Sequence, residues 1–365
     1  MKSDSFSYDD KEEIKKIINA YDRFVPFEIM KLLGKNKITD VKLGDHIEIK
    51  LTILFSDIRN FTTLSESITP AETFNFINSY FSKMEELIEN KNGIIDKYIG
   101  DAIMALFPKN ADEALECSIS MINKLNSFNQ NRIKQNFTPI KIGIGLNTGI
   151  CILGTVGGIN RMEGTVISDS VNLASRLESL TKKYGVNLII SEHTLRELKD
   201  INNYSIRFLD RVLVKGKIQP QSIYEVYDND EENIIKLKDE TKVIFEEALA
   251  YYHYKKIDKA KELLEKCIEI NSNDNPAKLY LKRCDDYIDN NIYEGSYEIT
   301  KPSEWSKEYE LGNKDIDSQH KELFEYSYKL LDSVNNDLDK NEIDKIRAFL
   351  DDYVIDHFMT EEKEM

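Results

Sequence analysis

Two aspartates follow apolar segments that have the pattern of buried strands. Asp57 comes two residues after the segment "IKLTILF", and Asp101 follows a glycine in "GIIDKYIGDAIMALF". Two converging carboxylates repel each other unless one is protonated or a cation lies between them. Because Mg²⁺ prefers hard oxygen ligands with room for water and phosphate, the pair predicts a divalent-metal site. Aspartate is also common in turns, so turn capping would explain either residue taken alone.

A helix pattern in "SDSVNLASRLESLTKKYG" carries an amide and a guanidinium at helical spacing. Ser168 or Asp169 is the expected N-cap, and Asn172 and Arg176 are four residues apart, so they share one helix face. Together they can hold an oxygen atom and a developing phosphoryl charge. An exposed helix with an ordinary arginine is the alternative for this segment alone.

Short strands alternate with helices between about residues 48 and 228, which indicates an α/β or α+β sandwich with helices covering one sheet. A tight turn at Gly100 and Asp101 should form a hairpin that brings Asp101 to the sheet end, facing Asp57. Strands are expected at 49–56, 94–98, 102–107, 140–146, 150–156, 186–190, 206–214 and 222–227. Helices are expected at 70–90, 111–128, 168–183 and 191–199.

Composition narrows the class of partner. The chain has 365 residues, 41% of them apolar and 31% charged, which suits soluble domains with cores of their own. Its net charge of −16 disfavours nucleic acid and anionic membrane surfaces. No run of 18 apolar residues occurs, so we expect no membrane insertion. The four cysteines lack CxxC spacing, which favours reduced thiols and a cytoplasmic location.

Taken together, these motifs resemble the catalytic domain of the class III nucleotide cyclases, from about residue 24 to about residue 227. The resemblance implies an α+β fold with a ferredoxin-like core and an active site built between two protomers of a homodimer. It implies that Asp57 and Asp101, helped by the Ile58 carbonyl, bind two Mg²⁺ or Mn²⁺ ions. Asn172 would orient the ribose, and Arg176 would stabilise the transferring phosphoryl group.

The same resemblance assigns further substrate contacts. In "VLVKGK", Lys215 rather than Lys217 would contact the terminal phosphates. Lys97 and Thr165 occupy the two positions at which the family reads the base. A lysine only donates, so Lys97 suits the N1 acceptor of adenine and opposes the N1–H of guanine, whereas Thr165 permits either base. The expected activity is therefore that of an adenylate cyclase acting on ATP. The alternatives are a guanylate cyclase and a non-catalytic nucleotide-binding regulator.

Four segments are expected along the chain: a helical lead-in at 1–47, the cyclase domain at 48–228, a tetratricopeptide-like helix pair at 239–290 and an all-α end at 303–365. The end resembles the first half of a bacterial hemerythrin four-helix bundle, which would regulate the full-length product as an oxygen or iron sensor. It would supply only part of an iron ligand set, so a di-iron centre is expected only if the domain is completed. This suggests a fragment of a longer product. The implied iron ligands are His320, His357 and Glu361.

Overall fold

The computed structural model describes residues 27–134, 137–158, 161–212, 220–290 and the single residues 293, 318 and 321. The chain divides into two units, residues 1–297 and 298–365, and the fold below is that of the first. Most of the lead-in, the segment 213–219 and the hemerythrin-like end lie outside the described residues.

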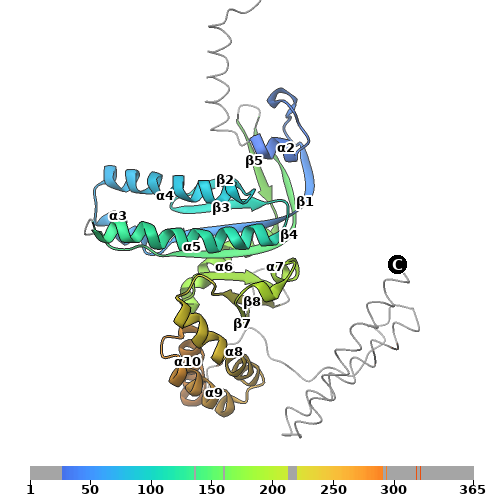
Figure 1. Ribbon diagram of the computed structural model, residues 1–365. Helices are drawn as coiled ribbons and strands as arrows, with labels where there is room; N and C mark the ends of the chain where they lie inside the picture. The colour runs from blue at the N-terminus through green and yellow to red at the C-terminus, as the bar shows by residue number, and fades with distance from the viewer. Residues whose placement is uncertain are drawn as a thin grey trace, which may run out of the picture. The chain divides into compact units, whose positions relative to one another are not determined.

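The described strands form one eight-stranded mixed sheet, with seven of them in the order β2-β3-β1-β4-β6-β8-β7 and β5 paired with β4 (Figure 1). The β4–β6 pair is parallel and the other pairs are antiparallel. The strands are β1 (His46–Ile58), β2 (Ile94–Ile99), β3 (Ala102–Phe107), β4 (Ile142–Gly158), β5 (Arg161–Ile167), β6 (Leu188–Ser191), β7 (Ile206–Val212) and β8 (Gln221–Val226).

The helices of the described residues fall into two groups. Those within the cyclase-like region are α2 (Phe27–Leu32), α3 (Phe61–Glu66), α4 (Pro70–Asn90), α5 (Ala111–Lys134), α6 (Asp169–Tyr184) and α7 (Glu192–Arg196). Short 3₁₀ turns cover Ile38–Asp40 and Ile201–Asn203. Three helices follow the last strand: α8 (Glu232–His253), α9 (Ile257–Ile270) and α10 (Asn275–Asn290).

The order β1-α4-β2-β3-α5-β4, with β1 between β3 and β4 in the sheet, is the ferredoxin-like arrangement. The expected α+β fold is therefore confirmed. Helix α4 begins at Pro70, where Thr69 and Glu72 form a capping box. Buried side chains of α4 and α5 pack with those of β1, β3 and β4 in one apolar core. This core fixes the ends of the strands from which the site residues project.

Two expected strands are one. The strands expected at 140–146 and 150–156 left a break between them, but β4 runs through Asn147 and Thr148 without interruption. Both side chains are buried and bonded: Asn147 donates to the Ser170 carbonyl at 3.0 Å, and the Thr148 hydroxyl lies 2.9 Å from that of Thr52. These hydrogen bonds remove the cost of burying polar groups inside a strand. The sequence analysis also missed β5, which pairs along the end of β4.

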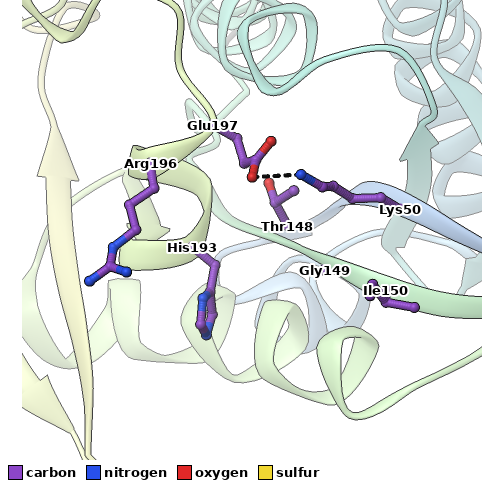
Figure 2. A pocket seen from close by; sticks show the side chains of 7 residues that line it. All are labelled: Lys50, Thr148, Gly149, Ile150, His193, Arg196 and Glu197. Carbon is purple, nitrogen blue, oxygen red and sulfur yellow. Dashed lines mark hydrogen bonds and ion pairs between the residues drawn. The ribbon is translucent and has the colours of Figure 1, made fainter. Parts of the chain in front are cut away.

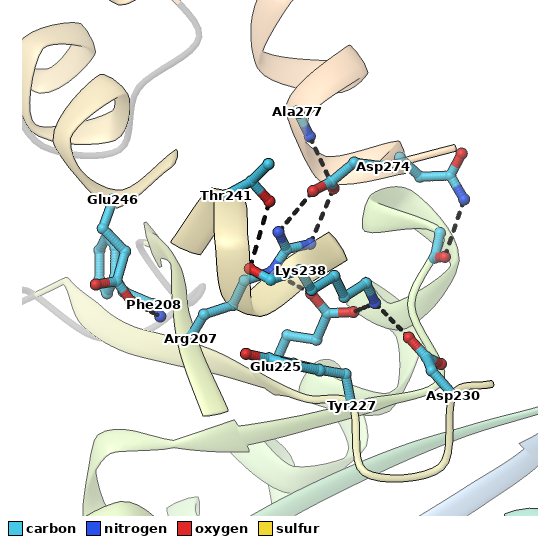
Figure 3. A network of polar contacts seen from close by, with 12 residues as sticks. Arg207, Phe208, Glu225, Tyr227, Asp230, Lys238, Thr241, Glu246, Asp274 and Ala277 are labelled. Atoms are coloured by element: carbon cyan, nitrogen blue, oxygen red, sulfur yellow. Dashed lines mark hydrogen bonds and ion pairs between the residues drawn. The ribbon is translucent and has the colours of Figure 1, made fainter. Parts of the chain in front are cut away.

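The helical region at 239–290 begins earlier and holds three helices rather than a pair. Its apolar side chains join those of α6, β6, β7 and β8 in a second core, so the tail packs on the cyclase-like sheet. A buried arginine of β7 marks the contact: Arg207 donates to Asp274, which precedes α10, at 2.6 and 2.9 Å, and to Glu225 at 2.7 Å (Figure 3). Lys238 of α8 donates to Glu225 as well, at 2.6 Å.

The four cysteines are buried free thiols. Within the described ranges, no helix combines the length and the apolar character needed to cross a bilayer.

Candidate active site

Asp57 and Asp101 lie together at one end of the sheet. The pairing of Ser56 with Ile103 places the turn between β2 and β3 beside the end of β1. Gly100 makes that turn in the left-handed region, at φ 65°. Burial, followed by hydrogen bonding and charge repulsion from Asp57, raises the pKa of Asp101 to about 7. The sequence expectation that these two acids converge is thus met by the geometry.

The electrostatics of this pair fit a cation. One carboxylate oxygen of Asp101, Oδ2, is buried without a hydrogen-bond partner. Such an atom beside a second carboxylate is costly until positive charge arrives. The Ile58 main chain lies at the same point, since Ile58 ends β1 and its N–H partly offsets the rise in the pKa of Asp101. Two carboxylates and a carbonyl would leave coordination positions for oxygen atoms of water and substrate.

A metal site formed entirely by protein side chains would need more ligands than this pair. Among the described residues, no group of three or more histidine, cysteine, aspartate or glutamate side chains is arranged to hold a metal ion. A site with few protein ligands would suit Mg²⁺, which usually keeps several waters or substrate oxygens.

Sequence reasoning missed a third carboxylate, Glu178 of α6. Burial raises its pKa to about 7, with a further contribution from the charge of Asp57, and Arg59 acts in the opposite direction. Glu178 comes close because α6 lies directly on β4 at a glycine: a Cβ at Gly143 would lie 2.8 Å from Glu178 Oε1. The signal in the sequence was the pair of glycines in "KIGIG", since glycine in a strand often marks a close backbone approach.

Helix α6 carries Asn172 and Arg176. Ser168 is its N-cap and accepts from the Ser170 N–H at 3.0 Å, which settles one alternative left open by the sequence. Asn172 is exposed and Arg176 is half-buried. The helix buries Leu173, Ala174, Leu177, Thr181 and Tyr184, whereas the side chain of Asn172 lies on its exposed face.

Lys97 and Thr165 contact each other directly. Lys97 Nζ lies 3.0 Å from Thr165 Oγ1, 3.2 Å from Glu163 Oε1 and 3.4 Å from Asp96 Oδ2. Lys97 is on β2 and Thr165 is on β5, two strands that are not neighbours in the sheet. The structure thus brings together the two residues that the sequence assigned to base recognition.

The other assignments are separate or lie outside the described residues. Within the described part of the chain, no hydrogen bond or ion pair joins the Lys97–Thr165 pair to the Asp57–Asp101 pair. Five residues assigned from the sequence lie outside the described residues. They are the phosphate-binding candidate Lys215, its alternative Lys217, and the predicted iron ligands His320, His357 and Glu361.

A small pocket of about 170 Å³ lies elsewhere on the same sheet (Figure 2). Several of its polar groups are paired: Lys50 bonds Glu197 at 2.7 Å, and the Thr148 hydroxyl bonds that of Thr194 at 3.1 Å. It is smaller than the usual ligand pocket and contains none of the site residues assigned from the sequence. The lining residues are Lys50, Thr148, Gly149, Ile150, His193, Arg196 and Glu197.

The fold and the convergent residues define a nucleotide cyclase domain. The chain belongs to the family of adenylate and guanylate cyclase catalytic domains, whose profile matches residues 46–228. It is 43% identical over 220 residues to the adenylate cyclase of Anabaena cylindrica, covering 59% of this chain and 44% of that protein. It is 35% identical over 279 residues to the terminal-differentiation-specific adenylate cyclase of Dictyostelium discoideum, covering 75% of this chain and 13% of that protein.

A solved structure of a bacterial light-regulated adenylyl cyclase is similar at a TM-score of 0.54 and 26% identity. That likeness covers 60% of this chain and 64% of the other. The chain spans less than half the length of each of the two curated relatives named above.

Proposed function

We propose that this protein is an adenylate cyclase, which converts ATP to 3′,5′-cyclic AMP and pyrophosphate at a site shared by two protomers. The observation that carries the choice of adenine is the contact between Lys97 Nζ and Thr165 Oγ1 at 3.0 Å. It sets an obligate donor beside a hydroxyl that can accept. The adenine edge offers the matching pair, with N1 as an acceptor and the 6-amino group as a donor.

Guanine fits this pair less well. Its N1–H would face the ammonium of Lys97, donor against donor, and leave a polar group without a partner on binding. Thr165 does not discriminate by itself, because a hydroxyl both donates and accepts. The preference for ATP therefore depends on Lys97. The names of the Anabaena and Dictyostelium relatives, both adenylate cyclases, support the same substrate.

Asp57 and Asp101, with the Ile58 carbonyl, would hold the metal ions of the reaction. The buried, unpartnered Oδ2 of Asp101 beside a second carboxylate supports this role. When bound there, two Mg²⁺ or Mn²⁺ ions supply charge that neutralises the phosphates and lowers the pKa of the ribose 3′-hydroxyl. The two carboxylates would hold that charge near the reacting phosphate, where the 3′-oxygen would bond to the α-phosphorus as the bond to pyrophosphate breaks.

The remaining residues act on the ribose and the phosphates. Asn172 would hold a ribose oxygen, which fixes the direction of attack. Arg176 would meet negative charge that grows as the bond to pyrophosphate breaks, and a charge placed there accelerates the reaction rather than merely binding substrate. Lys215 would hold the terminal phosphates. Asn172 and Arg176 occupy one helix, so they should act as a unit.

The shared site requires a second copy of the chain. One protomer would supply Asp57 and Asp101, and its partner would supply Lys97, Thr165, Asn172 and Arg176. An exposed apolar surface supports this pairing. It is formed on β4 and β5 by Ile150, Ile152 and Ile167, and Ile167 is 57% exposed although it sits opposite Ile152 in the sheet. Contiguous exposed apolar residues are typical of association surfaces. We call these three residues the β4–β5 apolar surface.

We also propose that the helical end regulates the enzyme when a hemerythrin-type domain is complete. His320, His357 and Glu361 would then be joined by further ligands around two iron ions. A di-iron site needs convergent ligands from four helices, so these three residues would supply only part of the ligand set.

Product analysis tests the proposal most directly. The purified chain is incubated with ATP or with GTP, in Mg²⁺ or Mn²⁺, and the products are separated by chromatography. Cyclic AMP with pyrophosphate is the expected result. Cyclic GMP formed from GTP at a higher kcat/KM than cyclic AMP from ATP would instead make it a guanylate cyclase, and equal values would remove the adenylate assignment. Nucleotide binding without either product would make it a regulator.

A further inference from the structure

Asp96 is a buried carboxylate beside the base-reading lysine, and neither the sequence motifs nor the comparisons assign it a role. Its side chain is 0% exposed, although it lies on β2 at the edge of the sheet. Both carboxylate oxygens lack a hydrogen-bond partner. A buried carboxylate in this condition is unusual, because native proteins satisfy most buried polar atoms.

The strand is irregular at this residue. The pairing of β2 with β3 steps from Ile95 opposite Ala105 to Lys97 opposite Met104, so Asp96 is the extra residue of a β-bulge. In a regular strand, neighbouring side chains point to opposite faces and would not meet. The bulge permits Asp96 Oδ2 to lie 3.4 Å from Lys97 Nζ. Bulges are frequent beside active sites, where they redirect a side chain.

Three oxygen atoms surround the Lys97 ammonium, which has three donors. Asp96 Oδ2 is its ion-pair partner at 3.4 Å, and Thr165 Oγ1 at 3.0 Å and Glu163 Oε1 at 3.2 Å are hydrogen-bond acceptors. The Glu163 side chain is 56% exposed, and exposed ion pairs contribute little. The Asp96 side chain is shielded from water, so its carboxylate cannot turn out into solvent. When a base enters, Glu163 is therefore the acceptor most easily displaced.

We propose that Asp96 is a positioning residue that holds the Lys97 ammonium in place beside Thr165, and that it thereby sets the discrimination between adenine and guanine. The inference rests on the proposed role of Lys97 in reading the base. Asp96 fixes Nζ from the buried side, so that a donor faces the N1 position of the base. Without the charge of Asp96, the long side chain of Lys97 can turn away from the N1–H of guanine. The repulsion between the two donors is then relieved.

The charge balance at Lys97 agrees with this assignment. Burial lowers the pKa of Lys97, but the negative charge of Asp96, with smaller contributions from Glu163, outweighs it and the net shift is upward. Burial raises the pKa of Asp96 itself, and Lys97 acts against that rise. Each group thus favours the charged form of the other.

The test is a double-mutant cycle on the full-length chain, with the ratio of kcat/KM for ATP to that for GTP as the readout. Asp96→Asn keeps the shape of the side chain and removes its charge. We expect this ratio to fall by about tenfold, the size of one lost contact to a charged group. In a Lys97→Ala background, Asp96→Asn should leave the ratio unchanged, because the residue acts through Lys97. Glu163→Gln, which removes the exposed partner, is the matched control and should alter the ratio by less than about twofold.

A structural role alone would lower kcat/KM for both nucleotides equally and leave their ratio intact, and that result would overturn the proposal. The proposal would also be overturned if Asp96→Asn changed the ATP-to-GTP ratio of kcat/KM as much in the Lys97→Ala background as in the unmodified chain. If Asp96→Asn does not fold, Asp96→Glu keeps the charge and displaces it by one methylene, so the same fall in the ratio is expected. The proposed function fails separately, when the unmodified chain shows no preference for ATP.

Discussion

Asp274 accepts two hydrogen bonds from the guanidinium of Arg207, at 2.6 and 2.9 Å, with both side chains fully buried. One residue belongs to the helical tail and the other to β7 of the cyclase-like sheet. Arg207 also lies over the ring of Phe245 of α8, with 4.6 Å between the guanidinium carbon and the ring centroid. The tail is thus joined to the sheet by buried charge as well as by apolar packing.

Removing one partner of this pair should destabilise the fold strongly. In Asp274→Asn, Arg207 keeps its charge but loses part of its compensation, and breaking a buried pair typically costs about 3–5 kcal/mol. Urea unfolding measures the loss of unfolding free energy. Asp285→Asn is the matched control, because its ion pair with Lys261 at 2.7 Å is exposed and should contribute less than about 1 kcal/mol. Equal losses in the two variants would show that the buried pair does not hold the tail.

Substitution of either candidate metal ligand should abolish turnover while the chain remains folded. Asp57→Ala and Asp101→Ala each remove an oxygen ligand, and neither residue belongs to the apolar cores. Cyclic nucleotide production is measured at saturating Mn²⁺, and circular dichroism verifies the fold. Activity that persists in either variant would refute the paired-aspartate assignment.

Two inactive chains should restore activity when mixed. Asp57→Ala removes a proposed metal ligand, which one protomer supplies to the shared site. Arg176→Ala removes the proposed phosphoryl-stabilising residue, which the partner supplies. Equal mixing should recover roughly a quarter of wild-type activity, because random pairing makes half of the dimers mixed and each of these has one native site. Exchange of chains is verified with two affinity tags. A mixture that exchanges chains and stays inactive would rule out the shared site.

A charge on the β4–β5 apolar surface should separate the protomers. Ile167→Asp places a carboxylate in the proposed interface, so the dimer should dissociate and activity should fall with it. Val243 of α8 offers a control, since it is 73% exposed and lies on the tail, away from this surface. Val243→Asp should leave mass and activity unchanged. Light scattering after size-exclusion chromatography measures both masses, and a dimeric Ile167→Asp protein would contradict the interface.

Two truncations should behave in opposite ways. Deletion of residues 296–365 leaves α8–α10 in place, so basal cyclase activity should persist. Deletion from residue 229 onward removes those helices and exposes Leu209, Ile223 and the charge of Arg207, so that protein should aggregate.

Iron analysis of the full chain tests the terminal segment: we expect little bound iron, and two irons per protomer would contradict that expectation.

Local patterns predicted the parts of the site that depend on local structure. Alternating and apolar runs located β1 and β3, Pro70 marked the start of α4, and Gly100 marked the turn that carries Asp101. These features need only a few neighbouring residues. They were sufficient to place the two aspartates at one end of the sheet.

Features that depend on distant contacts were missed. The segment of β5 contains charges and a glycine, and it is a strand because β4 extends far enough to pair with it. Glu178 approaches Asp57 because α6 lies on a glycine of β4. Asp96 was not singled out from the sequence, because the bulge that brings it to Lys97 depends on the pairing of β2 with β3. Such relationships are set by tertiary packing, which no short window of sequence contains.

The glycines of β4 limit how the sequence of this chain can diverge. A side chain at Gly143 would collide with Thr181, one at Gly145 with the main chain of α6, and one at Gly149 with Ser170. Any of these changes would lift the helix from the strand and carry Asn172 and Arg176 with it. The exposed residues of α6 other than Asn172 are under no such restriction. Replacements should therefore be tolerated at those positions more readily than at the three glycines of the strand beneath the helix.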